Sequence, residues 1–280
     1  MTISRTGYKD YFDTTFIWTT KVKKLLILLA SLPILWTSNV GAADCDAWHF
    51  NIVPYFWAVN IHGDIEVGVP AEGVPNQLLY ISENFSGILK HVNSGGMIDI
   101  NASKGNFGLF TSAMYVSIKN INVTTSDGFE VQVNSKFGLF SAGAFYHAYE
   151  YQFEHKCRVA VGPYVGARYT RNESGATLIE APEYSSSYDA HWTEPFIGAT
   201  LLFDINQNWS INLAGDIGVF KRRQESYNII GLIDYKLMQH LNIYLGYRQL
   251  YQSFTEGSGA TFFEWRMHVS GPIIGFALGF

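Results

Sequence analysis

The sequence predicts an all-β fold: a closed antiparallel transmembrane β-barrel of about ten strands, with eight or twelve strands as alternatives. Three observations favour this fold. Long stretches alternate between apolar and small or polar residues, which is the two-residue period of a strand that separates two environments. The turns between these stretches are alternately short and long. Aromatic residues make up 16% of the chain and charged residues only 15%, which suits strands that cross lipid.

The chain is predicted to divide into an N-terminal extension with a signal peptide at residues 1–43 and a single barrel domain at residues 44–280. Three lysines precede an apolar run at 25–36, and small residues at 40–43 offer a cleavage site. The apolar run is too short to cross a bilayer as a helix. A role for residues 1–20 does not follow from the sequence.

Strands are assigned wherever the alternation persists. The clearest alternation runs over Leu241–Tyr251, where Ile243 and Leu245 alternate with Asn242 and Gly246. An even number of strands returns the C-terminus to the side of the N-terminus. The expected strands lie near residues 48–61, 95–104, 106–118, 129–150, 158–171, 194–205, 209–221, 226–237, 241–254 and 262–280.

The connections separate by side, as expected for short periplasmic turns and longer outer loops. The short connections lie at 104–106, 154–156, 206–208 and 238–240, and the longer ones near 62–94, 119–128, 172–193, 222–225 and 255–261. The first long loop is predicted to hold a short helix, because Phe85, Ile88, Leu89 and Val92 follow helical spacing behind a possible N-cap at Ser82. Packing over the barrel rim is the favoured role for this helix, and plugging the lumen is the alternative.

The last strand has one bulky and one small face. Phe276, Leu278 and Phe280 form the bulky face, and they alternate with the small residues Gly275, Ala277 and Gly279. A terminal phenylalanine behind such alternation resembles the C-terminal signal of bacterial outer-membrane β-barrels, which implies recognition by the barrel assembly machinery. The assigned signal residues are Gly275, Phe276, Leu278 and Phe280.

Counting back from Phe280 in steps of two residues places Arg266 and His268, earlier in the same strand, on the lipid face. Because arginine is costly in lipid, a β-bulge at Gly271-Pro272 is predicted to turn both residues inward.

Several blocks resemble a broad family of Gram-negative outer-membrane β-barrel proteins without established activity. They are Trp48–Trp57, His62–Asp64, Phe85–His91, Gly96–Asp99, Gly105–Phe110, Gly166–Tyr169, Gly215–Gly218, Gly246–Arg248 and Arg266–His268. The chain departs from the pattern by carrying Val269-Ser270 before Gly271-Pro272. The resemblance implies a barrel in the cell outer membrane, in contact with outer-membrane lipid, and implies no mechanism.

Charged residues are predicted on the inner face of several strands. In a narrow barrel they need partners, because unpaired buried charge is costly. A non-enzymatic structural or surface protein with a lumen largely filled by this network is the favoured interpretation, and a narrow pore for small solutes is an alternative. The predicted lumen network is Asp99, Lys136, Arg168, Asp216, Asp234 and Arg248.

A lipid-modifying barrel enzyme is a third interpretation. His62 and Asp64, and His191 and Glu194, are expected at outer strand ends, where such a site would lie. No hydrolase or metalloprotease motif is present, and the eight histidines lack ligand spacing, so no catalytic, cofactor or metal residue is assigned.

The net charge of −5 is spread along the chain, which argues against a nucleic-acid partner, and a monomer is expected. The two cysteines, Cys45 and Cys157, are predicted to form a disulfide on the periplasmic side.

Overall fold

The computed structural model describes residues 47–68, 76–124, 128, 130–153, 157–180, 185–218 and 224–280. The predicted signal peptide and Cys45 lie outside these residues. The described elements are β1 (His49–Trp57), β2 (Asn60–Val67), β3 (Gln77–Glu83), α2 (Phe85–His91), β4 (Val92–Lys104), β5 (Phe107–Thr124), β6 (Glu130–Tyr146), β7 (Tyr149–Gln152), β8 (Arg158–Leu178), β9 (Ser185–Asp204), β10 (Trp209–Gly218), β11 (Gln224–Met238), β12 (Leu241–Glu256), the 3₁₀ turn Gly259–Thr261 and β13 (Phe263–Gly279).

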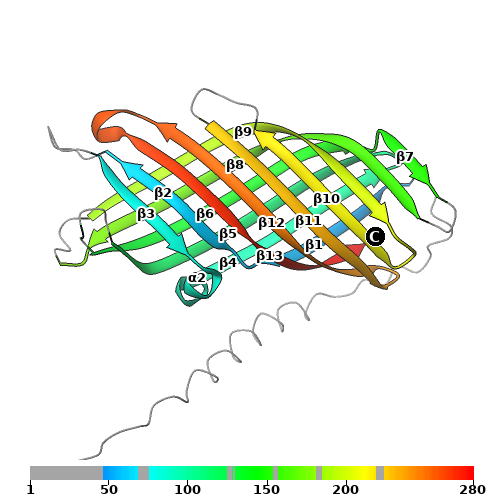
Figure 1. Cartoon of the computed structure of the whole chain (residues 1–280), viewed down its shortest axis with the longest axis horizontal. Coiled ribbons are helices and arrows are strands. Elements are labelled where there is room, and N and C mark those ends of the chain that lie inside the picture. The colour runs from blue at the N-terminus through cyan, green and yellow to red at the C-terminus, as the bar shows by residue number, and fades with distance from the viewer. Residues whose placement is uncertain are drawn as a thin grey trace, which may run out of the picture. The chain divides into compact units, whose positions relative to one another are not determined.

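The strands form one antiparallel sheet that closes on itself as a barrel (Figure 1). β1 pairs with β4 on one side and with β13 on the other, which joins the two ends of the sheet. The last residue takes part, because Phe50 and Phe280 exchange backbone hydrogen bonds of 3.1 and 2.8 Å. The antiparallel barrel predicted from the alternation is therefore confirmed.

The thirteen described strands occupy ten positions around the barrel wall, because three of these positions are each shared by two shorter strands that follow one another. β1 and β2 pair with successive parts of β13, and β6 and β7 pair with successive parts of β8, so each couple occupies one position. The third couple is β3 and β4, described below. The predicted count of ten is confirmed for the wall, whereas the breaks within three positions were not expected.

The second wall position is interrupted by α2. Continuing the β1–β4 register would place His91 opposite Ile61, but Glu83, eight residues earlier, occupies that place at the end of β3. α2 is therefore an excursion inserted between two halves of one strand. Asn84, rather than the predicted Ser82, caps it, because the Asn84 side chain accepts a hydrogen bond from the Gly87 amide at 2.9 Å.

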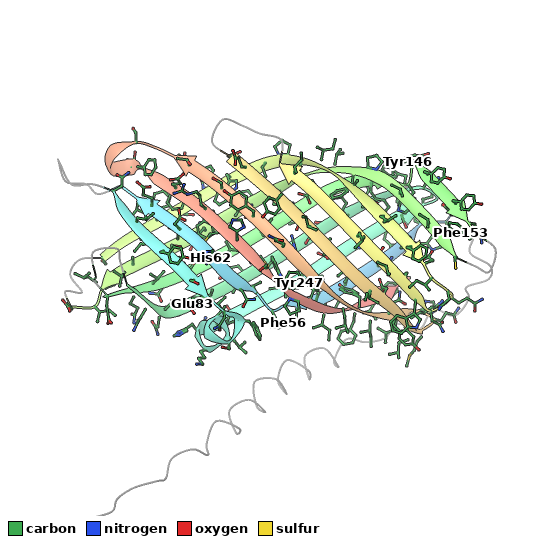
Figure 2. All side chains as sticks on the ribbon, in the orientation of Figure 1. Phe56, His62, Glu83, Tyr146, Phe153 and Tyr247 are labelled. Atoms are coloured by element: carbon green, nitrogen blue, oxygen red, sulfur yellow. The ribbon has the colours of Figure 1, made fainter. Side chains whose placement is uncertain are left out.

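The helix lies against the outside of the wall. Phe85 on α2 meets Phe56 of β1 edge to face at 5.7 Å, and Phe56 projects from the outer face beside the helix (Figure 2). Only Ile88 is buried among the helical residues. The helix therefore packs against the outer side of the wall between β3 and β4, rather than over the rim as predicted, and it does not plug the lumen.

The end that holds the C-terminus has short connections, which marks it as the periplasmic end. At the opposite end β8 runs to Leu178 and β9 begins at Ser185, so most of the segment 172–193 that was predicted as a loop is strand. That part of the prediction was wrong because polar residues continue the strands beyond the lipid, where the apolar alternation used to recognise strands is lost.

An apolar band surrounds the outer face. On β11 the outward positions Tyr227, Ile229, Ile233 and Tyr235 are apolar or aromatic, and Glu225 follows beyond Tyr227 toward the extracellular end. Tyrosines at both borders with aliphatic residues between them are typical of strands that cross a bilayer. No described helix is long and apolar enough to cross a membrane.

The C-terminal strand keeps one phase over its whole length. Phe276 projects outward, whereas the Tyr244 ring fills the space beside Gly275 inside the barrel. β13 pairs with β12 without a register shift from Phe263 to Leu278, so the predicted bulge at Gly271-Pro272 is wrong.

Arg266 and His268 therefore lie on the outer face. Arg266 donates to the Asp64 carboxylate at 2.8 Å, and His268 stacks on Tyr251 with ring centroids 4.4 Å apart. Both lie on the extracellular side of the apolar band, so the cost of arginine in lipid does not arise.

Cys157 lies at the periplasmic turn before β8, and its Sγ donates to the Ile205 carbonyl oxygen at 3.1 Å. Since Cys45 is outside the described residues, the Cys45–Cys157 disulfide stays a prediction. Mass spectrometry of unreduced peptides from the native envelope tests it, and finding both thiols alkylatable would end it.

Candidate functional site

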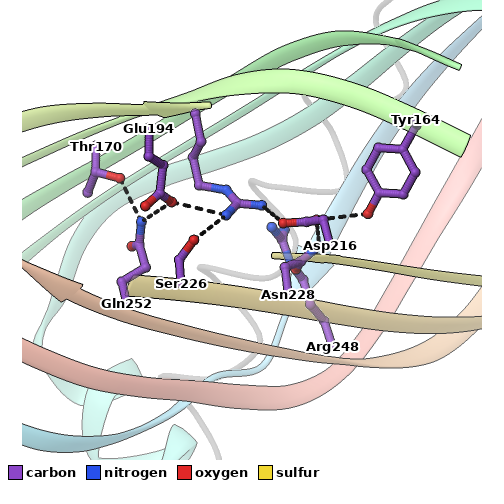
Figure 3. Close-up of polar contacts among 9 residues, drawn as sticks. Tyr164, Thr170, Glu194, Asp216, Ser226, Asn228, Arg248 and Gln252 are labelled. Carbon is purple, nitrogen blue, oxygen red and sulfur yellow. Dashed lines mark hydrogen bonds and ion pairs between the residues drawn. The ribbon is translucent and has the colours of Figure 1, made fainter. Parts of the chain in front are cut away.

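A belt of polar and charged side chains crosses the barrel interior at mid-height (Figure 3). It is built by five consecutive wall strands, β8 to β12, whose alternation turns every second residue inward. We call this set the interior belt: Tyr164, Arg168, Thr170, Glu194, Asp216, Ser226, Asn228, Arg248 and Gln252.

Arg168 is the centre of the belt. Its Nη1 lies 3.1 Å from Glu194 Oε1 and its Nη2 lies 2.6 Å from Asp216 Oδ1, with all three side chains no more than 3% exposed. The guanidinium also lies 4.8 Å from the centroid of the Phe196 ring. One cation therefore joins carboxylates from two neighbouring strands in a site that excludes water, where such charges depend on one another.

Asp216 is held by further donors. The Tyr164 hydroxyl and the Asn228 side-chain amide each donate to Asp216 Oδ2 at 2.8 Å. Arg248 Nε donates to Asn228 Oδ1 at 2.8 Å, and the Arg248 guanidinium lies 4.8 Å from the Trp57 ring centroid. Arg248 thus links the charged side of the interior to the apolar cluster around Trp57.

Gln252 connects the two ends of the interior belt across the lumen. Its amide nitrogen lies 2.9 Å from Thr170 Oγ1 and 3.4 Å from Glu194 Oε1. Thr170 is on β8 and Gln252 on β12, and three strands lie between them in the sheet order. In a ten-position wall these two strands face each other, so the hydrogen bonds span the lumen.

Aromatic side chains fill the interior on the extracellular side of the belt. Trp192 stacks on Phe254 at 4.5 Å, and Tyr188 stacks on Phe263 at 4.1 Å between ring centroids. Two cavities of about 370 and 510 Å³ lie at the extracellular rim, and no belt residue lines either of them. The belt is therefore covered from outside by packed rings.

The predicted lumen residues divide into three groups. Arg168, Asp216 and Arg248 come together in the interior belt. Asp99 and Asp234 also face inward but lie apart from it, Asp99 beside Ser112 on β5 and Asp234 at 3.3 Å from the Asn212 amide nitrogen on β10.

Lys136 is on the outer face, where its ammonium contacts Glu173 at 2.8 Å, so its assignment to the lumen was wrong. On β6 the bulky residues Phe137 and Leu139 point inward, and the polar face is the outer one, beyond the lipid.

Glu194 was missed as a member of the network. It was weighed only with His191, as part of a possible catalytic pair. Extending the alternation of β9 backward from Gly198 puts Glu194 on the inner face, so the signal was present. Tyr164 was missed for another reason: a tyrosine gives no charge signal.

The residues considered for catalysis do not converge. His62 and Asp64 project from the outer face of β2, and His191 projects from the outer face of β9, whereas Glu194 faces inward. His62 contacts the Tyr80 hydroxyl at 2.9 Å. Within the described ranges, no three His, Cys, Asp or Glu side chains form a group that could hold a metal ion.

The closed antiparallel wall and its apolar outer band define an outer-membrane β-barrel, the class that the sequence blocks resemble. Neither a protein-family model nor a curated protein matches the chain. Among solved structures, the outer membrane protease OmpT from Escherichia coli is similar over 88% of this chain and 100% of its own, with a TM-score of 0.59 and 10% sequence identity. The attachment invasion locus protein Ail from Yersinia pestis matches 84% of this chain and 99% of its own, at a TM-score of 0.33 and 10% identity. At these identities the likeness to OmpT concerns the fold alone.

Proposed function

We propose that this protein is a non-enzymatic outer-membrane barrel with a structural or surface role, whose lumen is closed by the interior belt. The observation that carries the proposal is the chain of contacts from β8 to β12 through Arg168, Glu194 and Gln252. A passing solute would have to separate buried charges from their partners, at a cost of several kcal/mol. The stacked rings above the belt add a second barrier.

Planar-bilayer conductance tests the closed lumen. The wild-type barrel is expected to give no steady open channels, because the belt crosses the lumen. A variant with Arg168, Glu194 and Asp216 all replaced by Ser removes the central charges and bulk, and it is expected to conduct. The matched control is R266Q, which removes a cation from the outer face and should stay silent. Steady wild-type channels would defeat the proposal in favour of a narrow pore for small solutes.

The non-enzymatic part is supported by the divergence of the candidate residues, since His62 and His191 point away from the interior. The test compares the lipid A and phospholipid composition of cells with and without the protein. Unchanged composition is expected. A modified lipid that disappears with H62A or H191A would establish a lipid-modifying enzyme instead.

Assembly through the last strand is a further part of the proposal, in which the barrel assembly machinery recognises Gly275, Phe276, Leu278 and Phe280. The replacement F280S keeps the backbone hydrogen bonds between residues 50 and 280 and removes the terminal ring. It is expected to lower the amount of heat-modifiable barrel in the outer-membrane fraction. F56S, which removes an outward ring elsewhere, is the control. Equal loss in both variants would contradict a signal at the terminus, and loss in neither would also contradict it. The barrel is expected to be a monomer on gel filtration in detergent.

A further inference from the structure

A cavity of about 510 Å³ lies at the extracellular tips of β5, β6, β8 and β9. We call it the rim cleft. Its lining includes three cationic side chains, Lys119, Lys136 and Arg171, together with the carboxylates of Glu173 and Asp189. Two serines whose side chains share the outer face with these ions, Ser117 on β5 and Ser187 on β9, also line it, whereas the Ser135 and Ser174 hydroxyls turn inward to Asn172. Cations and hydroxyls around one concave site suit an anionic, sugar-like group.

Among the described residues that line the rim cleft, three cationic side chains face two carboxylates, so the ion pairs within the cleft do not neutralise all of its positive charge. Lys136 contacts Glu173 at 2.8 Å, and Arg171 contacts Glu173 and Asp189 at 2.9 and 2.8 Å. The Lys119 ammonium forms no ion pair within the described part of the chain. The paired groups are a third to a half exposed, and ion pairs in water contribute little, so exchanging a carboxylate for a phosphate there costs little.

Directly below the rim cleft the outer face opens into a slot. Gly138 stands in register between Tyr115 on β5 and Arg171 on β8. A Cβ atom added to Gly138 would meet nothing within 4 Å, so the absent side chain leaves open space on the outer face. Toward the membrane the slot continues past Phe140 and Tyr169, which are 48% and 39% exposed. Polar groups above and apolar rings below match the two ends of an amphiphile.

We infer that the rim cleft and the slot at Gly138 bind a phosphorylated glycolipid of the outer leaflet. Its phosphate lies between Lys119 and Lys136, its sugar hydroxyls meet Ser117 and Ser187, and an acyl chain lies in the slot. The ligand is a lipid rather than a free sugar phosphate, because the slot runs from the cleft down the lipid-facing wall. The site is independent of the interior belt, and its test does not depend on whether the lumen conducts.

The experiment uses the purified full barrel in neutral detergent with EDTA, so that divalent ions do not bridge phosphate to carboxylate. The probes are diphosphorylated lipid A, the same lipid after removal of its phosphates, and glucosamine 1-phosphate. Native mass spectrometry measures the bound fraction. The phosphorylated lipid is expected to bind about tenfold or more tightly than either other probe.

Three variants locate the site, each first shown to keep heat-modifiable mobility. K119Q/K136Q is expected to lose about tenfold or more in affinity for the phosphorylated lipid. G138L adds a side chain at a position where a Cβ atom meets nothing within 4 Å, and it is expected to weaken binding of the same lipid while leaving the charge of the protein surface intact. R266Q, which removes a cation elsewhere on the outer face, is expected to bind as the wild type does.

Equal binding of the phosphorylated and dephosphorylated lipids would overturn the inference. So would equally tight binding of glucosamine 1-phosphate, which would assign the cleft to free sugar phosphates. An equal loss in R266Q would show that surface charge alone retains the lipid, and unchanged binding in G138L would remove the slot from the site.

Discussion

Two arginines on the same strand show how much depends on the face from which a side chain projects. Arg168 and Arg171 are three residues apart on β8, so they point to opposite sides of the wall. Arg168 contacts its carboxylates at 3.1 and 2.6 Å, and Arg171 contacts its carboxylates at 2.9 and 2.8 Å. The side chain of Arg168 is 2% exposed, whereas that of Arg171 is 49% exposed. Similar distances therefore describe two different energetic situations.

The difference is the presence of water. On the rim, water solvates each ion when its partner is removed, and salt screens what remains. Inside the belt, no water replaces a lost partner, so one missing charge leaves the others buried and uncompensated. The belt is consequently a unit, whereas the rim pairs are separable contacts.

The strongest test is the same substitution at both positions. R168M is expected to lower the free energy of unfolding by about 3–5 kcal/mol, because Glu194 and Asp216 lose their shared cation. R171M is the matched control on the same strand and should unfold at the wild-type urea concentration. Tryptophan fluorescence during urea titration in detergent micelles measures both. Equal midpoints for the two variants would contradict the comparison.

A rescue experiment sharpens this test. If the cost of R168M comes from unpaired carboxylates, the triple variant R168M/E194Q/D216N should be more stable than R168M alone, because both buried negative charges are removed. The amide oxygen that replaces Asp216 Oδ2 can still accept from the Tyr164 hydroxyl and the Asn228 side-chain amide. A triple variant less stable than R168M would show that the belt is held by packing and hydrogen bonds rather than by charge.

The fold follows from the sequence more closely than the belt does. Alternation locates most strands because lipid and interior demand opposite side chains, and it places Arg168, Asp216 and Arg248 inside. The same rule fails at Lys136, because beyond the lipid the outer face is polar too and alternation no longer tells which face is inside.

The bulge predicted at Gly271-Pro272 failed for a related reason. A bulge is needed only if Arg266 lies within the bilayer. The position of Arg266 along the membrane normal depends on where β13 leaves the lipid, and the alternation of apolar residues does not mark that point. The break between β3 and β4 depends on pairings made by β2 and β13, which are far apart in sequence.

A smaller effect is expected at Arg248. R248L removes one hydrogen bond to Asn228 and the contact with the Trp57 ring, but no ion pair within 4 Å among the described residues. The free energy of unfolding should fall by about 1–3 kcal/mol, less than for R168M. The same urea titration measures it, and a cycle of R248L, W57L and the double variant isolates the ring contact, because W57L alone also loses core packing and the indole hydrogen bond to the Gly271 carbonyl. A loss as large as that of R168M would mean that Arg248 neutralises inner carboxylates such as Asp99 over a longer distance.

The smallest expected effect concerns salt. Raising the ionic strength from about 0.1 to 1 M shortens the screening length from about 10 to 3 Å, which weakens exposed ion pairs and leaves buried ones largely unscreened. The wild-type barrel and K136Q should therefore differ little at low salt and not measurably at high salt, because the Lys136–Glu173 pair is solvent-exposed. In contrast, the stability difference between the wild type and R168M should persist at 1 M. Urea midpoints at both salt concentrations decide the matter. If the R168M difference vanished at high salt, ions and water would reach the belt, and the contrast between the two faces of β8 would be lost together with the closed lumen.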